Sequence, residues 1–157
     1  MSVKGLGDRT ICQICVIVDD VEKYTKRYAE VFGIEMPKAY HYTVGHDQTK
    51  ATYYGEPTEA RAKIISFSMG DVQFELLEPI GGPSVWKDFL DQHGCGVHHI
   101  AFNVKGTDQV TQSFAEHGYK VSQQGLFTGL PRGMYTYLTT EDALGTTVEL
   151  LEHFDQE

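Results

Sequence analysis

The 157-residue sequence lacks the features that mark several large classes of protein. No stretch approaches the roughly 18 consecutive apolar residues that a membrane-spanning helix needs. No basic segment followed by an apolar run opens the chain, so we expect no secretory signal. The sequence has only three cysteines. Without a secretory signal they fit a reducing compartment, and we expect a cytoplasmic protein.

Basic residues are also in short supply, with 13 Lys and Arg against 22 Asp and Glu and a net charge of -9. This balance disfavours binding to nucleic acid or to an anionic membrane, because either would need a basic surface. It does not exclude an anionic substrate, which a metal or a few Arg can hold locally. An apolar content of 41% is that of an ordinary globular protein. We expect a single domain spanning residues 1–157.

The sequence contains one pattern of strands and a helix that occurs twice. An apolar strand at residues 11–18 leads into a helical stretch that ends at Gly33, and a second strand at 96–104 leads into a helical stretch that ends at Gly118. Each copy closes on a strand that carries Glu-Leu-Leu-Glu, at residues 75–78 and 149–152. Two copies indicate paired half-domains rather than a solenoid. Module 1 covers about 9–80 and module 2 about 96–153, with a linker helix within 81–95.

The local signals place the remaining elements. We expect a helix after Asp19 or Asp20 with an apolar face that includes Val31 and Phe32, and a second helix over 108–117 with Thr107 as its N-cap. Residues 36–60 read as loop with some strand, and Ser84 caps the short linker helix. Hairpins join 61–68 to 72–78 and, through residues 142–145, join 134–140 to 146–152.

Four polar residues recur at fixed positions within the apolar strands: Gln13, Glu75, His99 and Glu149. Because side chains alternate across a strand, each of the four lies opposite strongly apolar neighbours that can pack on a helix. If a pseudo-two-fold axis relates the modules, the four side chains converge on one point. One imidazole nitrogen and several oxygens suit a divalent metal ion: Zn, Ni, Co, Mn or Mg.

The same alternation assigns other polar residues elsewhere. Glu78 and Glu152 have the opposite parity and read as surface residues. His98 points to the face opposite His99, although it could still support the site. The remaining histidines read as loop or helix-surface residues: His41, His46, His93, His117 and His153. Cys12 and Cys15 face opposite ways, so their spacing does not indicate a zinc knuckle.

The repeated unit, the Gly-Val-His-His-Ile-Ala-Phe run at 96–102 and the two Glu-Leu-Leu motifs resemble the vicinal oxygen chelate superfamily. That superfamily includes glyoxalase I, methylmalonyl-CoA epimerase, extradiol dioxygenases and bleomycin-resistance proteins. The resemblance covers residues 9–153 and implies an α+β fold. Two βαβββ modules would form a curved, mixed, eight-stranded sheet around a metal, with the helices on its convex face. Its metal positions fall on Gln13, Glu75, His99 and Glu149.

The resemblance also implies a chemistry. The stretch from Pro79 to His99 resembles the epimerase branch, and the implied activity is a metal-dependent isomerase or epimerase, like methylmalonyl-CoA epimerase, that moves a proton next to a metal-bound carbonyl via an enolate. Glu149 is the first candidate for the catalytic base and Glu75 the second. Arg132 is a candidate to bind a phosphate or carboxylate of the substrate.

Two alternatives stand beside this reading. The mix of Gln, Glu, His and Glu resembles one branch of glyoxalase I, which implies a lactoylglutathione lyase acting on a thiol adduct of a 2-oxoaldehyde. The other alternative is a non-catalytic module that binds a small ligand. We expect a small-molecule partner, either an acyl-CoA or a thiol adduct, no nucleic-acid or membrane partner, and a homodimer.

Overall fold

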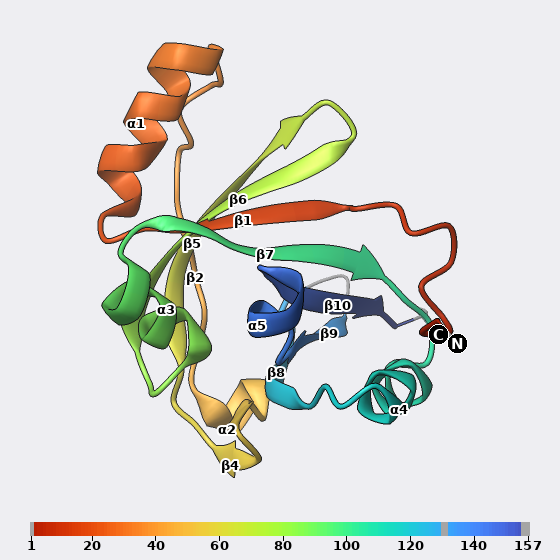
Figure 1. Ribbon diagram of the computed structural model, residues 1–157. Helices are drawn as coiled ribbons and strands as arrows, with labels where there is room; N and C mark the ends of the chain where they lie inside the picture. The colour runs from red at the N-terminus through yellow and green to blue at the C-terminus, as the bar shows by residue number, and fades with distance from the viewer. Residues whose placement is uncertain (1, 130–131, 155–157) are drawn as a thin grey trace.

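The computed structural model describes residues 2–129 and 132–154, which form one curled mixed sheet with helices against it (Figure 1). Ten strands lie in the order β2-β5-β6-β1-β7-β10-β9-β8-β3-β4. The bounds of the longer strands are β1 Gln13–Ile17, β5 Arg61–Met69, β6 Val72–Gly81, β7 Gly96–Asn103, β8 Val121–Leu126, β9 Gly133–Leu138 and β10 Thr147–His153. The α+β class with a curved mixed sheet is confirmed.

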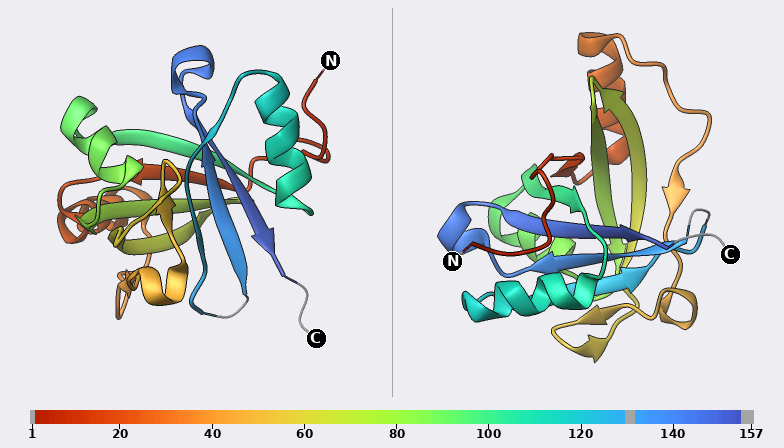
Figure 2. Two further views of the ribbon diagram at one scale, coloured as in Figure 1. Left: turned by 90° about the horizontal axis from the view of Figure 1, so that it is seen from below. Right: turned by 90° about the vertical axis from the view of Figure 1, so that its right-hand side faces the viewer.

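The two copies of the sequence pattern become two halves of this sheet. β1 pairs in parallel with β6, and β7 pairs in parallel with β10. β1 and β7 pair antiparallel and join the halves at the centre. In the right-hand view of Figure 2 the strands β5 and β6 run across the direction of β8, β9 and β10, because the sheet curls between the halves.

The expected number of eight strands was wrong, and the extra two come from the segment 36–60. Besides β2 (His41–Tyr42), this segment holds a short helix α2 (His46–Thr49) and a hairpin of β3 (Thr52–Tyr53) and β4 (Glu56–Pro57). β3 pairs with β8, so a piece of the first module extends the sheet of the second. This pairing joins segments far apart in the chain, and no local periodicity of the sequence signals it.

Helices α1 (Val21–Phe32) and α4 (Thr107–Glu116) cover one face of the sheet. The side chain of Asp20 caps α1 by accepting a hydrogen bond from Lys23 N at 3.0 Å, and Gly33 ends the helix in the left-handed region. Val16 and Leu76 pack beneath α1, and Val148 and Leu150 pack beneath α4. These residues are the apolar faces that strand alternation predicts.

The last turn of α1 departs from the expected packing. Val31 is 74% exposed and Phe32 is 58% exposed. Phe32 stacks on the ring of Tyr28, with ring centroids 5.6 Å apart. Only the earlier turns of α1 therefore bury apolar surface against the sheet.

The second Glu of each Glu-Leu-Leu-Glu motif holds the start of its own module's helix. Oε2 of Glu78 accepts a hydrogen bond from Val21 N at 2.9 Å. Glu152 accepts bonds from Gly106 N and Thr107 N, each at 2.9 Å, and from the Thr107 hydroxyl. Thr107 is therefore the first residue of α4 rather than its N-cap, and the two glutamates are half-buried caps rather than free surface residues.

Helix α3 (Val85–His93) begins after the capping side chain of Ser84, as expected, and packs against the opposite face of the sheet. There Val85 and Trp86 join a buried cluster with Cys15, Ile17 and Leu77. The expected hairpin turn at 142–145 is instead a short helix, α5 (Glu141–Leu144), that Gly145 ends with φ 78°. Glycine favours this left-handed conformation because it has no Cβ.

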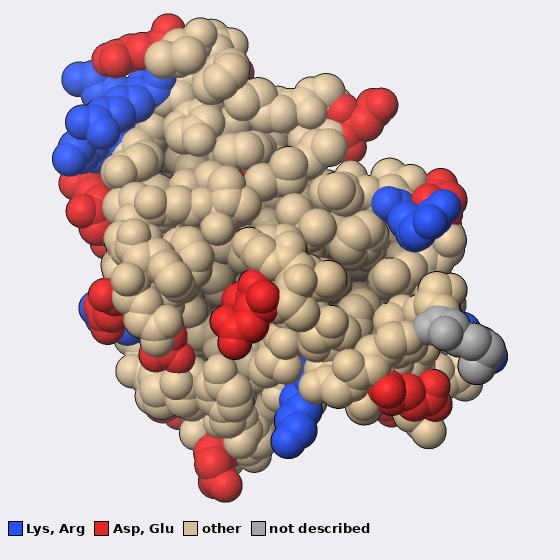
Figure 3. Space-filling model, viewed as in Figure 1, with Lys and Arg blue, Asp and Glu red and all other residues tan. Residues whose placement is uncertain are grey.

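None of the helices in the described part of the chain is long and apolar enough to cross a membrane. On the face drawn in Figure 3, Lys and Arg side chains gather over α1, while acidic groups are scattered over the rest. The largest group of basic side chains on this side therefore lies over α1, with acidic side chains beside it.

Candidate metal centre

Two rows of side chains cross the middle of the sheet on the face away from α1 and α4. In the first row, Cys15 on β1 pairs with both Glu75 on β6 and His99 on β7. In the second row, Ala101 on β7 pairs with both Gln13 on β1 and Glu149 on β10. Directly paired residues project to the same face. The short side chain of Cys15 thus lies between Glu75 and His99, and that of Ala101 lies between Gln13 and Glu149.

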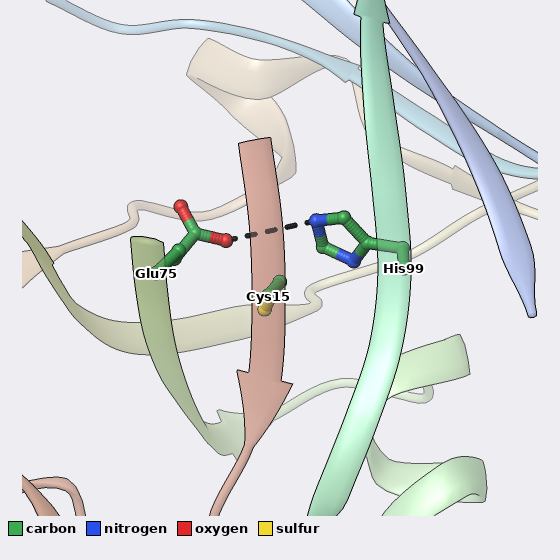
Figure 4. A group of neighbouring side chains, drawn as sticks. All are labelled: Cys15, Glu75 and His99. Carbon is green, nitrogen blue, oxygen red and sulfur yellow. Dashed lines mark ion pairs between the residues drawn. The ribbon is translucent and has the colours of Figure 1, made fainter. Parts of the chain in front are cut away.

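Three of the four residues that the repeat predicts lie close to one nitrogen, Nε2, of the fourth, His99. Its Nε2 lies 3.0 Å from Oε2 of Glu149 and 3.2 Å from Oε1 of Gln13. Oε1 of Glu75 lies 3.8 Å from the same nitrogen, across β1 (Figure 4). His99 is fully buried, Gln13 and Glu149 are buried, and Glu75 is 13% exposed at its side chain. The geometry therefore brings all four together on one side of the sheet.

His98 lies on the same side as His99, contrary to the expectation from strand alternation. Cys15 pairs with His99 while Val16 pairs with Val97, so β7 has one extra residue at this point. Such a bulge redirects a side chain that would otherwise point away. Nδ1 of His98 lies 2.8 Å from Nδ1 of His99. His98 therefore contacts the nitrogen of His99 that does not face the glutamates.

Burial and charge shape the protonation of the centre in the absence of metal. Burial raises the pKa of Glu75 to about 7, although His99 opposes the shift. Burial by itself would lower the pKa of His99, but Glu149, through its charge and a hydrogen bond, and Glu75 raise it overall. Burial, followed by the charges of Glu75 and Glu149, holds the pKa of the Cys15 thiol well above its usual range.

The donor set fits a divalent metal ion. Oε2 of Glu149 is buried, and its polar neighbour is Nε2 of His99 at 3.0 Å, a nitrogen that can itself bind a metal. Two carboxylates, an amide oxygen and an imidazole nitrogen surround the same space, and these are ligands for Zn, Ni, Co, Mn or Mg. Gln13 Nε2 donates to Gln73 Oε1 at 2.7 Å, which leaves the amide oxygen of Gln13 facing His99. A bound cation would satisfy this buried carboxylate oxygen together with the imidazole nitrogen and the amide oxygen beside it.

Cys15 is a fifth candidate donor that the sequence analysis did not select. Its sulfur and ligand atoms of Glu75 and His99 lie within 4.8 Å of one another (Figure 4). Cys15 follows Gln13 by two residues and so shares its face, which is the signal in the sequence that could have identified it. Its place in the buried cluster with Trp86 also fits a small apolar residue.

A cavity of about 490 Å³ opens over the centre. Gln13, Glu75 and Glu149 form part of its lining. Most other lining residues are apolar or aromatic, among them Ile64, Leu77, Trp86, Leu126, Phe127, Tyr135 and Leu151. His41 and His153 also line this cavity, so the expectation that they are only loop or surface residues was incomplete. The cavity has the size and mixed lining of a small-molecule site.

Arg132 lies at a neighbouring place. It is exposed and lines a second cavity of about 380 Å³ with Gln48, Phe127 and Phe154. Leu126, Phe127, Thr128 and Gly129 line both cavities. Arg132 is therefore not among the residues around His99, and any role for it concerns a more distant part of a ligand.

Comparisons with known proteins agree with this architecture. A sequence model of the Glyoxalase/Bleomycin resistance protein/Dioxygenase superfamily matches residues 12–137. The chain is 24% identical over 141 residues to the mitochondrial methylmalonyl-CoA epimerase of Bos taurus, covering 87% of this chain and 70% of that protein.

Two solved structures are similar throughout. Methylmalonyl-CoA epimerase from Mycobacterium tuberculosis matches with a TM-score of 0.65 and 20% identity, covering 99% of this chain and 94% of that one. A variant of the Streptomyces coelicolor methylmalonyl-CoA epimerase, in complex with 2-nitronate-propionyl-CoA, matches with a TM-score of 0.64 and 23% identity. That match covers 92% of this chain and 97% of the other. At such identities the structural likeness establishes the fold.

Proposed function

Because the chain belongs to the Glyoxalase/Bleomycin resistance protein/Dioxygenase superfamily, we propose that it is a metal-dependent isomerase or epimerase that moves a proton next to a carbonyl. The observation that carries this proposal is the convergence of Gln13, Glu75 and Glu149 on Nε2 of His99. We propose these four residues as the metal ligands. A divalent ion held there would polarise a substrate carbonyl and make the neighbouring C–H more acidic.

The four residues and the cavity wall would have different roles in the reaction. Glu149 is the proposed base, because its buried carboxylate lies 3.0 Å from Nε2 of His99 and lines the cavity. Glu75 is the second candidate, because its carboxylate lies 3.8 Å from Nε2 of His99 and lines the same cavity. Gln13 and His99 lack a comparable basic oxygen and would bind and orient. The apolar and aromatic wall would exclude water from the reacting carbon.

We propose an acyl-CoA thioester as the substrate class, in the manner of a methylmalonyl-CoA epimerase. The support is the likeness to epimerases in sequence and fold, one of them in complex with 2-nitronate-propionyl-CoA. Arg132 lies beside the second cavity, within the same loop region as the shared lining residues. It is the proposed contact for an anionic part of the substrate that lies away from the reacting carbon.

A glyoxalase-like lyase is the second candidate. The observation that favours it is the donor set itself, in which two carboxylates accompany one imidazole and one amide. Both reactions begin by removing a proton next to a carbonyl. They differ in where the proton returns, either to the same carbon or to the adjacent one.

The test is proton exchange in deuterated water. The metal-loaded protein is incubated with a panel of 2-methylacyl thioesters and of thiohemiacetals, and deuterium uptake is followed by NMR. Exchange at the α-carbon of a thioester with loss of configuration supports the epimerase. Conversion of a thiohemiacetal to a 2-hydroxy thioester supports the lyase instead. If no member of either group exchanges, the catalytic proposal is wrong and the ligand-binding alternative gains support.

A further inference from the structure

The charges around the cavity bear on which substrates it can accept. The described residues that line the 490 Å³ cavity include two glutamates, Glu75 and Glu149, but no Lys or Arg. The other titratable side chains in this lining are His41, His153, Tyr135 and Tyr137. The cavity therefore offers no permanent positive charge of its own among the residues that the structure describes.

Three basic side chains, two on strand β5 and one at the second cavity, lie outside this lining. Nζ of Lys63 forms an ion pair with Glu22 on α1, the helix on the opposite face of the sheet. Arg61 donates from Nε to Thr43 O at 3.4 Å and is exposed. Arg132 lines only the second cavity. None of these three side chains lines the 490 Å³ cavity.

The centre itself adds no net positive charge once it is loaded. Ligand carboxylates bind a metal in their ionised form. Two ionised glutamates carry two negative charges, which balance a divalent cation. A substrate carboxylate one bond from the reacting carbon would have to lie within a few ångströms of this balanced, largely buried group. It would then add an unpaired negative charge to an apolar cavity, which is costly.

We therefore propose that the cavity selects thioesters whose acyl part is uncharged next to the reacting carbon, and that Glu75 is a specificity-determining residue. This inference rests on the proposed function, because it assumes that the reacting carbonyl approaches the four-residue centre. It separates this chain from proteins named for methylmalonyl-CoA, whose acyl part carries a free carboxylate. The proposal concerns only the acyl part next to the reacting carbon and sets no condition on the charge of the CoA portion.

The test compares the binding of two CoA thioethers to the metal-loaded protein by calorimetry. One carries a 2-carboxypropyl group and the other the isosteric 2-carbamoylpropyl group, so that only the charge differs. The measurement is made at about pH 8, where an unperturbed imidazole is neutral. We expect the amide to bind at least ~10-fold more tightly, since an unpaired like charge in such a site opposes binding.

Glu75→Gln gives the decisive comparison, because it keeps an oxygen donor and leaves the loaded centre with one excess positive charge. We expect this variant to bind the carboxylate probe more tightly than the parent does. The affinity for the amide probe divided by that for the carboxylate probe should therefore fall ~10-fold. Glu56→Gln, at an exposed residue of β4 outside the cavity lining, is the matched control and should leave the ratio unchanged. Metal content and circular dichroism confirm that each variant is folded and loaded. If Glu75→Gln fails to fold, Glu149→Gln makes the same change of charge.

Three outcomes overturn the inference: equal or tighter binding of the carboxylate probe by the parent, a ratio that neither Gln variant moves, or binding of neither probe. The proposed function is judged separately by proton exchange. A protein that exchanges the α-protons of thioesters but prefers the carboxylate probe keeps the proposed function and refutes only the charge selection.

Discussion

Nε2 of His99 and Oε2 of Glu149 lie 3.0 Å apart, although the two residues are on different strands, β7 and β10. The parallel pairing of these strands places Glu149 beside Ala101, and the short Ala101 side chain leaves space for the carboxylate to reach His99. Both partners are buried. A buried imidazole nitrogen and a buried carboxylate oxygen this close together can bind one metal ion.

Metal binding is the first consequence to measure. The purified protein should hold about one divalent ion per chain, and His99→Ala or Glu149→Ala should lose most of it. Metal analysis after gel filtration gives the stoichiometry. Full metal retention by both variants would end the assignment of this centre.

The choice of base is tested by isosteric amides. Glu149→Gln keeps one oxygen donor but removes the basicity, so it should slow proton exchange by ~10²-fold or more at matched metal occupancy. Glu75→Gln should slow exchange less. Deuterium uptake at saturating substrate measures both variants. Exchange at the parental rate in Glu149→Gln would transfer the role of base to Glu75.

His98 should position His99 for the metal. Contact between the two Nδ1 atoms at 2.8 Å fixes the orientation of the His99 ring, so that its Nε2 faces the centre. His98→Phe keeps an aromatic ring against Tyr137 and Phe89 but removes the contacting nitrogen. Metal affinity should fall by ~10-fold or more. Unchanged metal affinity in a folded variant would show that the His98 ring contributes only packing.

The pH dependence of the metal-free protein follows from Glu75. Its pKa is about 7 in the folded chain against an ordinary value of 4.5, so between these pH values the folded state holds a proton that the unfolded state has released. The contribution of Glu75 to the free energy of unfolding should therefore fall as the pH rises from about 4.5 to about 7. Denaturant unfolding at several pH values measures the slope. Glu75→Gln should flatten it, and an unchanged slope in that variant would assign the effect to other groups.

Glu152 should contribute to stability without affecting metal. It caps α4 by accepting hydrogen bonds from the Thr107 hydroxyl, Thr107 N and Gly106 N, and these bonds, the hydroxyl's above all, lower the pKa of its carboxyl. Glu152→Ala should lower the free energy of unfolding by about 1–2 kcal/mol, the usual range for a lost helix cap. Denaturant unfolding of the metal-free protein provides the number, with metal stoichiometry as the control. A loss of metal in this variant would show that the cap also shapes the centre.

The repeat, the helices α1, α3 and α4, and the residues that share a face along each regular stretch of strand could be predicted from the sequence. Alternation along a strand depends only on backbone geometry, so Gln13, Glu75, His99 and Glu149 could be selected as a set without any coordinates. The doubled Glu-Leu-Leu-Glu motif was also visible in the sequence, and the first glutamate of each copy was selected for the metal site. Only the structure shows that the second one, Glu78 or Glu152, reaches the start of a helix.

The remaining features could not be predicted in this way, because they depend on contacts between segments that are distant in the chain. The bulge that turns His98 toward His99 arises where β7 pairs with β1. The hairpin of β3 and β4 exists as sheet only because β8 offers an edge to pair with. The cavity lining brings His41 of β2 near residues of β6 and β10. Periodicity predicts the face of a side chain, whereas register, curvature and edge pairing decide which side chains meet.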